Sequence, residues 1–137
     1  MEKITLYTNP NSRGRIIRWL LEECGADYEV VPVPFGENGT KSADFLAINP
    51  MGKLPAVKYG DAVITETAAL ITFLAELFPE KNLIPAIGTA ERGEFYRWLM
   101  FAMQPNTPLW TNGTAFPKHR NANTASATAV LTKSSPR

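Results

Sequence analysis

The chain opens with a strand, a turn, a helix and a second strand, and this order restricts its fold more than any other feature. A short β-prone run at residues 4–7 stops at the turn sequence Asn9-Pro10-Asn11. Residues 13–24 have helical periodicity, and Gly25 follows as a helix stop. The broad apolar face expected on that helix consists of Ile16, Ile17, Trp19, Leu20, Leu21 and Cys24. A second β-prone run at 28–33 completes a βαβ unit, whose two strands run parallel.

The next fifty residues add a helix, a hairpin and a second long helix. A glycine-containing loop precedes a short helix at 42–48, which Asn49-Pro50-Met51-Gly52 interrupts. Strands at 55–59 and 62–65 flank Gly60-Asp61, a two-residue hairpin signal in reversed order. A helix follows at 66–78, and Pro79 ends it. The order βαβ-α-ββ-α predicts an α/β fold of the thioredoxin-like kind, with one small mixed sheet between helices.

The pattern changes after residue 80, and again near residue 104. A linker at 81–88 leads to a helix from Ala90 to about Met103, whose apolar side includes Phe95, Trp98, Leu99 and Ala102. All 13 acidic residues precede residue 95, so that residues 1–103 carry a net charge of −3 and the remainder +4. We therefore expect a domain at 1–80, a linker at 81–88, the first helix of an all-α domain at 89–104 and a disordered, irregular tail at 105–137.

Composition excludes several classes of protein. The net charge of +1 gives no general reason to expect nucleic-acid binding. No run approaches the roughly 18 apolar residues of a membrane span, and the first residues do not resemble a signal peptide. The single cysteine, Cys24, excludes an intrachain disulfide and fits a reducing compartment. We expect a soluble, cytoplasmic protein without a metal site, since His119 stands alone in the tail.

Three motifs in order resemble the glutathione-binding domain of bacterial glutathione S-transferases. The first is Leu6-Tyr7-Thr8-Asn9-Pro10-Asn11-Ser12-Arg13 with the helix that follows. The second is Asn49-Pro50-Met51-Gly52-Lys53-Leu54-Pro55, similar to the family's loop that carries a cis-proline. The third is Ile64-Thr65-Glu66-Thr67, similar to the turn into the family's third helix. The resemblance covers residues 3 to about 103.

This resemblance implies that the chain binds glutathione as a co-substrate. Leu54 is expected to pair with its cysteinyl part through backbone groups, held by a cis bond to Pro55; a trans proline that begins a strand is the alternative. Thr67 is expected to bind the γ-glutamyl carboxylate at a helix N-terminus, and Glu66 to face the ammonium group. Ordinary capping of that helix by Thr65 is compatible with both roles. Lys53 either meets the glycyl carboxylate or is an unpaired surface lysine.

The residue that activates the glutathione thiol is the least determined part of the site. The thiolate is the reactive species, and a hydroxyl or amide donor near a helix N-terminus stabilises it. Ser12 is the first candidate and could instead cap the following helix. Asn9 and Asn11 are alternatives, because the active position shifts between classes of the family. Cys24 lacks a C-x-x-C partner, so we expect it to be buried.

The implied activity is glutathione transfer to an electrophilic small molecule, or glutathione-dependent reduction. The alternatives are a non-catalytic binding module and an inactive fragment, since fold does not fix function. Full-length members are expected to form homodimers with a second helical domain. The abrupt tail would follow from a truncation or from a frameshift. We expect such a chain to expose an apolar patch around its last helix, and to oligomerise or be unstable.

Overall fold

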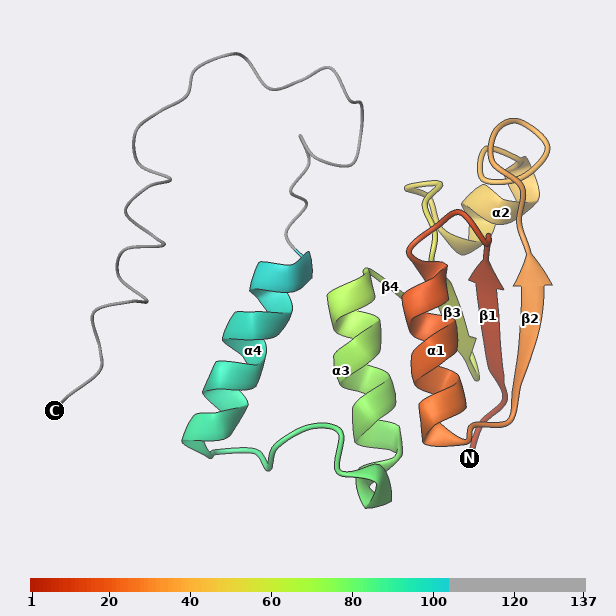
Figure 1. Cartoon of the computed structure of the whole chain (residues 1–137). Helices are drawn as coiled ribbons and strands as arrows, with labels where there is room; N and C mark the ends of the chain where they lie inside the picture. Colours follow the sequence, from red (N-terminus) through yellow and green to blue (C-terminus); the bar gives the residue numbers. More distant parts are fainter. Residues whose placement is uncertain (104–137) are drawn as a thin grey trace, which may run out of the picture. The chain divides into compact units, whose positions relative to one another are not determined.

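The computed structural model describes residues 1–103, which form a four-stranded mixed sheet with helices packed on it (Figure 1). Strand order is β2-β1-β3-β4, with β1 parallel to β2 and the other two pairs antiparallel. This is the predicted thioredoxin-like arrangement, and the prediction is confirmed. The elements in chain order are β1 (Ile4–Thr8), α1 (Gly14–Cys24), β2 (Tyr28–Pro32), α2 (Ala43–Ile48), β3 (Ala56–Tyr59), β4 (Ala62–Thr65), α3 (Thr67–Leu77), the 3-10 turn η1 (Pro79–Lys81) and α4 (Ala90–Met103).

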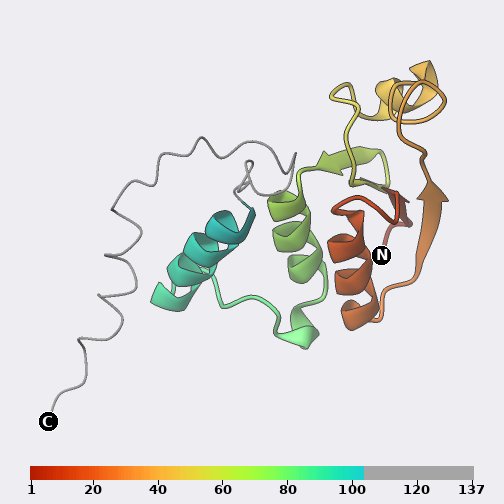
Figure 2. The ribbon, with the colours of Figure 1, turned by 45° about the horizontal axis from the view of Figure 1, so that its top comes forward.

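The core lies between the sheet and the pair α1 and α3, which run side by side in Figure 2. Alternation along β1 sends Ile4 and Leu6 into this core, where both are fully buried. Tyr7 points to the opposite face, and its ring centroid lies 6.2 Å from that of Phe45 on α2. Helices α1 and α3 therefore cover one face, and α2 packs on the other near the end of β1.

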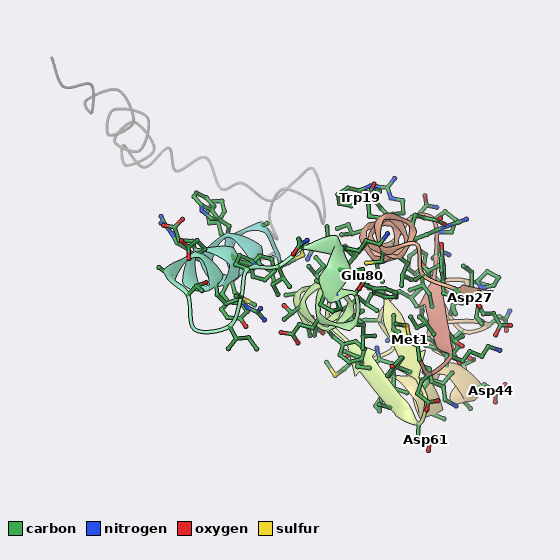
Figure 3. The ribbon with its side chains drawn as sticks, turned by 90° about the horizontal axis from the view of Figure 1, so that it is seen from below. Met1, Trp19, Asp27, Asp44, Asp61 and Glu80 are labelled. Atoms are coloured by element: carbon green, nitrogen blue, oxygen red, sulfur yellow. The ribbon has the colours of Figure 1, made fainter. Side chains whose placement is uncertain are left out.

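The buried stripe of α1 is narrower than the predicted apolar face. Ile17, Leu20, Leu21 and Cys24 are buried, but Trp19 is 64% exposed. Trp19 lies about 200° around the helix from Ile17, because each residue advances about 100°. Figure 3 shows its side chain projecting from α1 away from the sheet. The broad apolar face predicted for this helix therefore includes a residue, Trp19, that does not face the core.

The hairpin and the two long helices form close to their predicted positions. Gly60 and Asp61 connect β3 and β4 as predicted, with Gly60 at φ 57°, a conformation that glycine adopts without steric cost. Helix α1 begins at Gly14, one residue later than predicted. Helix α3 begins at Thr67 rather than residue 66, and Pro79 follows its end.

One buried arginine joins helix α4 to α3 and to the segment that connects them. The Arg92 guanidinium forms an ion pair with Glu76 of α3, donates to the Pro85 carbonyl oxygen at 2.8 Å and donates to the Tyr96 hydroxyl at 2.8 Å. Leu99 is buried beside it, whereas Trp98, predicted on the same apolar side, is exposed. The predicted tail and His119 lie outside the described residues.

Candidate functional site

The sheet register brings all three sequence motifs to one edge. Ala56 of β3 lies opposite Tyr7 of β1 on one side and opposite Thr65 of β4 on the other. Pro55 directly precedes Ala56, and Glu66 directly follows Thr65. The turn after β1, the entry to β3 and the exit from β4 therefore meet at the edge of the sheet where β1 ends (Figure 1). We call this the motif edge.

The loop that enters β3 contains a cis Leu54–Pro55 peptide bond, as predicted. Asn49, only 3% exposed, holds this loop from inside. Its side-chain NH₂ donates to the Lys53 carbonyl oxygen at 2.8 Å, and its Oδ1 accepts the Met51 N–H at 3.1 Å. The sequence placed Asn49 in a helix break and in the second motif, but gave its side chain no role. An Asn before Pro, at the end of a helix, is a signal for such an Asx turn and could have identified it.

Glu66 joins β4 to α3 in an uncommon backbone conformation. Its φ is 68° and its ψ 123°, outside the regions that non-glycine residues usually occupy. The Glu66 side chain is exposed, and its carbonyl oxygen accepts the Leu70 N–H at 2.9 Å. The expectation that Thr65 caps α3 was wrong, because Thr65 is the last residue of β4 and Glu66 occupies the N-cap position. Thr67, 6% exposed, is the first residue of α3.

The N-terminus of α3 lies at the motif edge and is suited to bind an anion. The first turn of an α-helix has N–H groups without intrahelical partners, and the helix dipole adds positive potential there. The exposed carboxylate of Glu66 lies beside this end of α3. The free N–H groups of the helix can therefore bind an anion, and the carboxylate can bind a cation. Lys53, on the neighbouring loop, is exposed and adds a positive charge to the same edge.

The turn between β1 and α1 is held by two of the three candidate thiol-activating residues. The Ser12 hydroxyl donates to the Asn9 carbonyl oxygen at 2.8 Å and accepts the Gly14 N–H at 3.0 Å. Asn9 donates from its side chain to the Val33 carbonyl oxygen at 3.0 Å. Asn11 donates its backbone N–H to Asn9 Oδ1 at 2.9 Å, and its side chain is exposed. Ser12 and Asn9 therefore stabilise the turn, and Asn11 displays its amide at the surface.

One contact that the sequence interpretation missed joins this turn to α4. Arg13 Nη1 donates to the Met103 carbonyl oxygen at 3.1 Å, at the C-terminal end of α4. A cation at this end is favourable because the last carbonyl groups of a helix carry partial negative charge. The C-terminal end of α4 is therefore held close to the motif edge. The two residues are ninety positions apart, and no local sequence pattern predicts such a contact.

Cys24 and two surface pockets lie away from the motif edge. Burial raises the pKa of the Cys24 thiol, which is 2% exposed, so the predicted structural burial is confirmed. A pocket of about 200 Å³ between β2 and α2 is lined by Tyr7 and Phe45 but by none of the predicted site residues. A second pocket, near Met1, also lacks them. Residues 1–103 contain no group of three metal-ligating side chains.

Together, the sheet order, the cis-proline at the start of β3 and the helix that follows β4 define a thioredoxin-like domain. The sequence model of the family described as "Glutathione S-transferase, N-terminal domain" matches residues 2–76. The chain belongs to the glutathione S-transferase family. No helix among residues 1–103 has the length and apolar character required to cross a membrane.

Relatives support this assignment. The chain is 34% identical over 99 residues to "Glutathione S-transferase 3" of Zea mays, covering 70% of this chain and 45% of that protein. It is 31% identical over 113 residues to "Disulfide-bond oxidoreductase YfcG" of Escherichia coli (strain K12), covering 77% and 51%. A glutathione transferase homolog from Lodderomyces elongisporus, solved with two GSH per subunit, superposes with a TM-score of 0.71 at 31% identity, covering 80% and 54%. The chain thus spans about half the length of these proteins.

Proposed function

We propose that the motif edge binds glutathione and that the protein is a glutathione transferase. The observation that carries this proposal is the register of Ala56 between Tyr7 and Thr65. This register brings together the backbone of Leu54, the N-terminus of α3 and the polar groups of the turn between β1 and α1. Glutathione is a peptide with two carboxylates, one ammonium group and a thiol, and each of these groups has a chemically matched partner there.

Leu54 pairs with the cysteinyl part of glutathione through its backbone N–H and C=O. The residue before a proline is held extended, which is the conformation that pairs with an extended peptide. Asn49 keeps the preceding loop in place through its bond to the Lys53 carbonyl oxygen. Leu54 therefore acts through its backbone, and Pro55 acts by fixing its direction.

Thr67 binds the γ-glutamyl carboxylate through its N–H and hydroxyl, helped by the dipole of α3. Glu66 faces the ammonium group of the same glutamyl unit, from a side chain that is exposed. Lys53 meets the glycyl carboxylate as a point charge. The two ends of the ligand thus meet groups of opposite charge, which fixes the direction in which glutathione lies across the motif edge.

The turn between β1 and α1 supplies the group that stabilises the thiolate. Ser12 remains the first candidate, and its hydroxyl must leave the Asn9 carbonyl oxygen in order to donate to sulfur. Asn11 needs no such exchange, because its side chain is exposed. Asn9 retains one side-chain N–H beyond its bond to Val33. The N-terminus of α1, which follows this turn, favours the thiolate in all three cases.

The activated thiol is transferred to an electrophilic small molecule, or it reduces a disulfide or peroxide. The name of the Escherichia coli relative, a disulfide-bond oxidoreductase, favours keeping the second reaction as a candidate. In this proposal residues 1–80 form the glutathione-binding domain. Residues 81–88 are the linker to a helical domain, which begins at residues 89–104 and contributes to the electrophile site. We also propose a cytoplasmic location. A non-catalytic binding module or an inactive fragment is the alternative, and turnover separates it from the enzyme.

Calorimetric titration of the purified chain with glutathione tests the proposal. Saturable binding is expected, and Glu66→Ala is expected to weaken it by about tenfold or more, because a hydrogen bond to a charged group contributes about 1.5–3 kcal/mol. Glu80→Ala is the matched control: Glu80 is exposed in η1, which follows the C-terminal end of α3. A folded chain that fails to bind glutathione contradicts the proposal. Binding without turnover of an electrophile or a disulfide favours the binding module.

A further inference from the structure

The end of β1 contains a buried hydroxyl group that has no hydrogen-bond partner. Thr8, the last residue of β1, is only 6% exposed, and its Oγ1 bonds to no group among residues 1–103. Burying a hydroxyl without a partner is unfavourable, and most buried polar side-chain atoms have one. The unpaired hydroxyl of Thr8 therefore suggests a bond that forms only in another state of the protein.

This hydroxyl faces the start of α1, in a space that it shares with Ser12. A Cβ atom built on Gly14 would lie 1.9 Å from Thr8 Oγ1 and 2.9 Å from Thr8 Cβ, so the oxygen is turned toward Gly14. The same Cβ atom would lie 2.9 Å from Ser12 Oγ. The two hydroxyl oxygens therefore border one small space, which is open because position 14 has no side chain.

The Ser12 hydroxyl already uses its full hydrogen-bonding capacity in this structure. A hydroxyl has one hydrogen to donate and two lone pairs to accept with. Ser12 Oγ donates to the Asn9 carbonyl oxygen at 2.8 Å, and it accepts the Gly14 N–H at 3.0 Å and the Asn9 N–H at 3.3 Å. The bond from the Asn9 N–H is the longest of the three and hence the easiest for another donor to replace.

We propose that Thr8 is a positioning residue for Ser12, and that its hydroxyl donates to Ser12 Oγ when Ser12 turns its own hydrogen toward the glutathione sulfur. This inference rests on the proposed function and on Ser12 as the residue that stabilises the thiolate. The Thr8 hydrogen takes the lone pair that the Asn9 N–H now occupies, and no covalent bond forms or breaks. The Asn9 carbonyl oxygen keeps the Ser12 backbone N–H, at 2.9 Å, as its partner.

The exchange of partners favours the thiolate in two ways. A hydroxyl that accepts a hydrogen bond becomes a stronger donor, because bonds in a chain polarise one another. Ser12 therefore donates more strongly to sulfur when Thr8 donates to Ser12. The unfavourable burial of the Thr8 hydroxyl also ends when this bond forms, so the bond adds to the preference for the charged form of the thiol.

Thr8→Val tests the inference, because valine keeps the branched shape of threonine and removes only the hydroxyl. The pKa of the bound glutathione thiol is measured from the ultraviolet absorbance of the thiolate across a pH series. We expect Thr8→Val to raise this pKa by about 0.5–1 unit, the size of one neutral hydrogen bond. Thr8→Ser keeps the hydroxyl and should retain the native thiol pKa. Thr5→Val, the same change on the opposite face of β1, is the matched control and should not shift it.

Three further measurements separate this role from a purely structural one. S-methylglutathione has no thiol, so its Kd should be the same for the native chain and Thr8→Val. In the Ser12→Ala chain, adding Thr8→Val should not shift the thiol pKa any further. Without glutathione, Thr8→Val should raise the urea midpoint of unfolding, because it removes an unpaired buried hydroxyl.

The possible failures of the inference and of the proposed function are distinguishable. A folded native chain that binds neither glutathione nor S-methylglutathione contradicts the proposed function, and the inference falls with it. If glutathione binds but Thr8→Val leaves the thiol pKa unchanged, or shifts it equally in the Ser12→Ala chain, only the inference is overturned. A lower urea midpoint for Thr8→Val also overturns it, since the Thr8 hydroxyl would then have a partner without glutathione.

Discussion

Ala56, the residue after the cis-proline, lies directly opposite Thr65, the residue before Glu66. This single register position fixes the distance between the loop that carries Leu54 and Pro55 and the N-terminus of α3. The two groups stand on neighbouring strands of one hydrogen-bonded ladder, and strands in a ladder lie about 4.8 Å apart. The sheet therefore positions both groups relative to each other.

Thr67→Val should weaken glutathione binding by about tenfold. Valine keeps the shape of threonine and the backbone N–H, so only the hydroxyl bond to the γ-glutamyl carboxylate is lost. Calorimetry measures the change, and urea denaturation checks that stability is retained. An unchanged dissociation constant would mean that the carboxylate does not meet the hydroxyl of Thr67.

Asn49→Ala should destabilise the chain by about 1–3 kcal/mol, because the Lys53 carbonyl oxygen and the Met51 N–H lose their buried partner. Glutathione affinity should fall with it, since the loop that carries Leu54 loses its support. Chemical denaturation measures the first effect and calorimetry the second. Asn38→Ala, in an exposed loop, is the control and should change neither.

Gly14→Ala and Gly93→Ala should change stability in opposite directions. A Cβ atom on Gly14 would lie 1.9 Å from Thr8 Oγ1, so Gly14→Ala should cost about 3 kcal/mol by forcing α1 away from β1. Gly93 has open space above it, and alanine there should stabilise α4 by about 1 kcal/mol through helix propensity. Equal effects in thermal melts of the two variants would contradict the close approach of α1 to β1.

Much of the fold was predictable because the residues that end its helices and strands lie next to those ends in the sequence. The turn after β1, the Gly60-Asp61 hairpin and the proline at position 79 each mark a boundary within a few residues of where it is found. The exposure of Trp19 was not predictable, because a helix rich in apolar residues has more than one apolar stripe and periodicity alone does not say which one meets the sheet. The exposure of Trp98 and Phe101 agrees with the apolar patch expected around the last helix.

The candidate site was predictable as a set of motifs but not as a geometry. Resemblance pointed to Leu54, Glu66 and Thr67, and the cis bond was expected. The positive φ of Glu66 could not be read from its residue type, because non-glycine residues seldom adopt such a φ. The engagement of Ser12 with the Asn9 carbonyl oxygen also depends on the folded turn. The contact of Arg13 with Met103 joins residues far apart in the chain.

Cys24 should react slowly with iodoacetamide in the folded chain and rapidly after unfolding. Its thiol is buried, and burial raises its pKa, so the folded chain holds it neutral. The stability that this neutral thiol contributes is fully present below the pKa of the unfolded thiol and falls as pH rises through the raised, folded value. Alkylation rates and urea midpoints measured between neutral and alkaline pH check both points. Cys24→Ser should remove the alkylation, while fast labelling of the native chain would contradict the burial.

An NMR titration of the ¹⁵N-labelled chain would show where glutathione binds. We expect glutathione to shift the backbone amides of Leu54 and Thr67 most, together with those of the turn from Asn9 to Ser12. Amides in the pocket beside Phe45 should move little. A well-dispersed spectrum that glutathione leaves unchanged, or shifts confined to that pocket, would contradict the account.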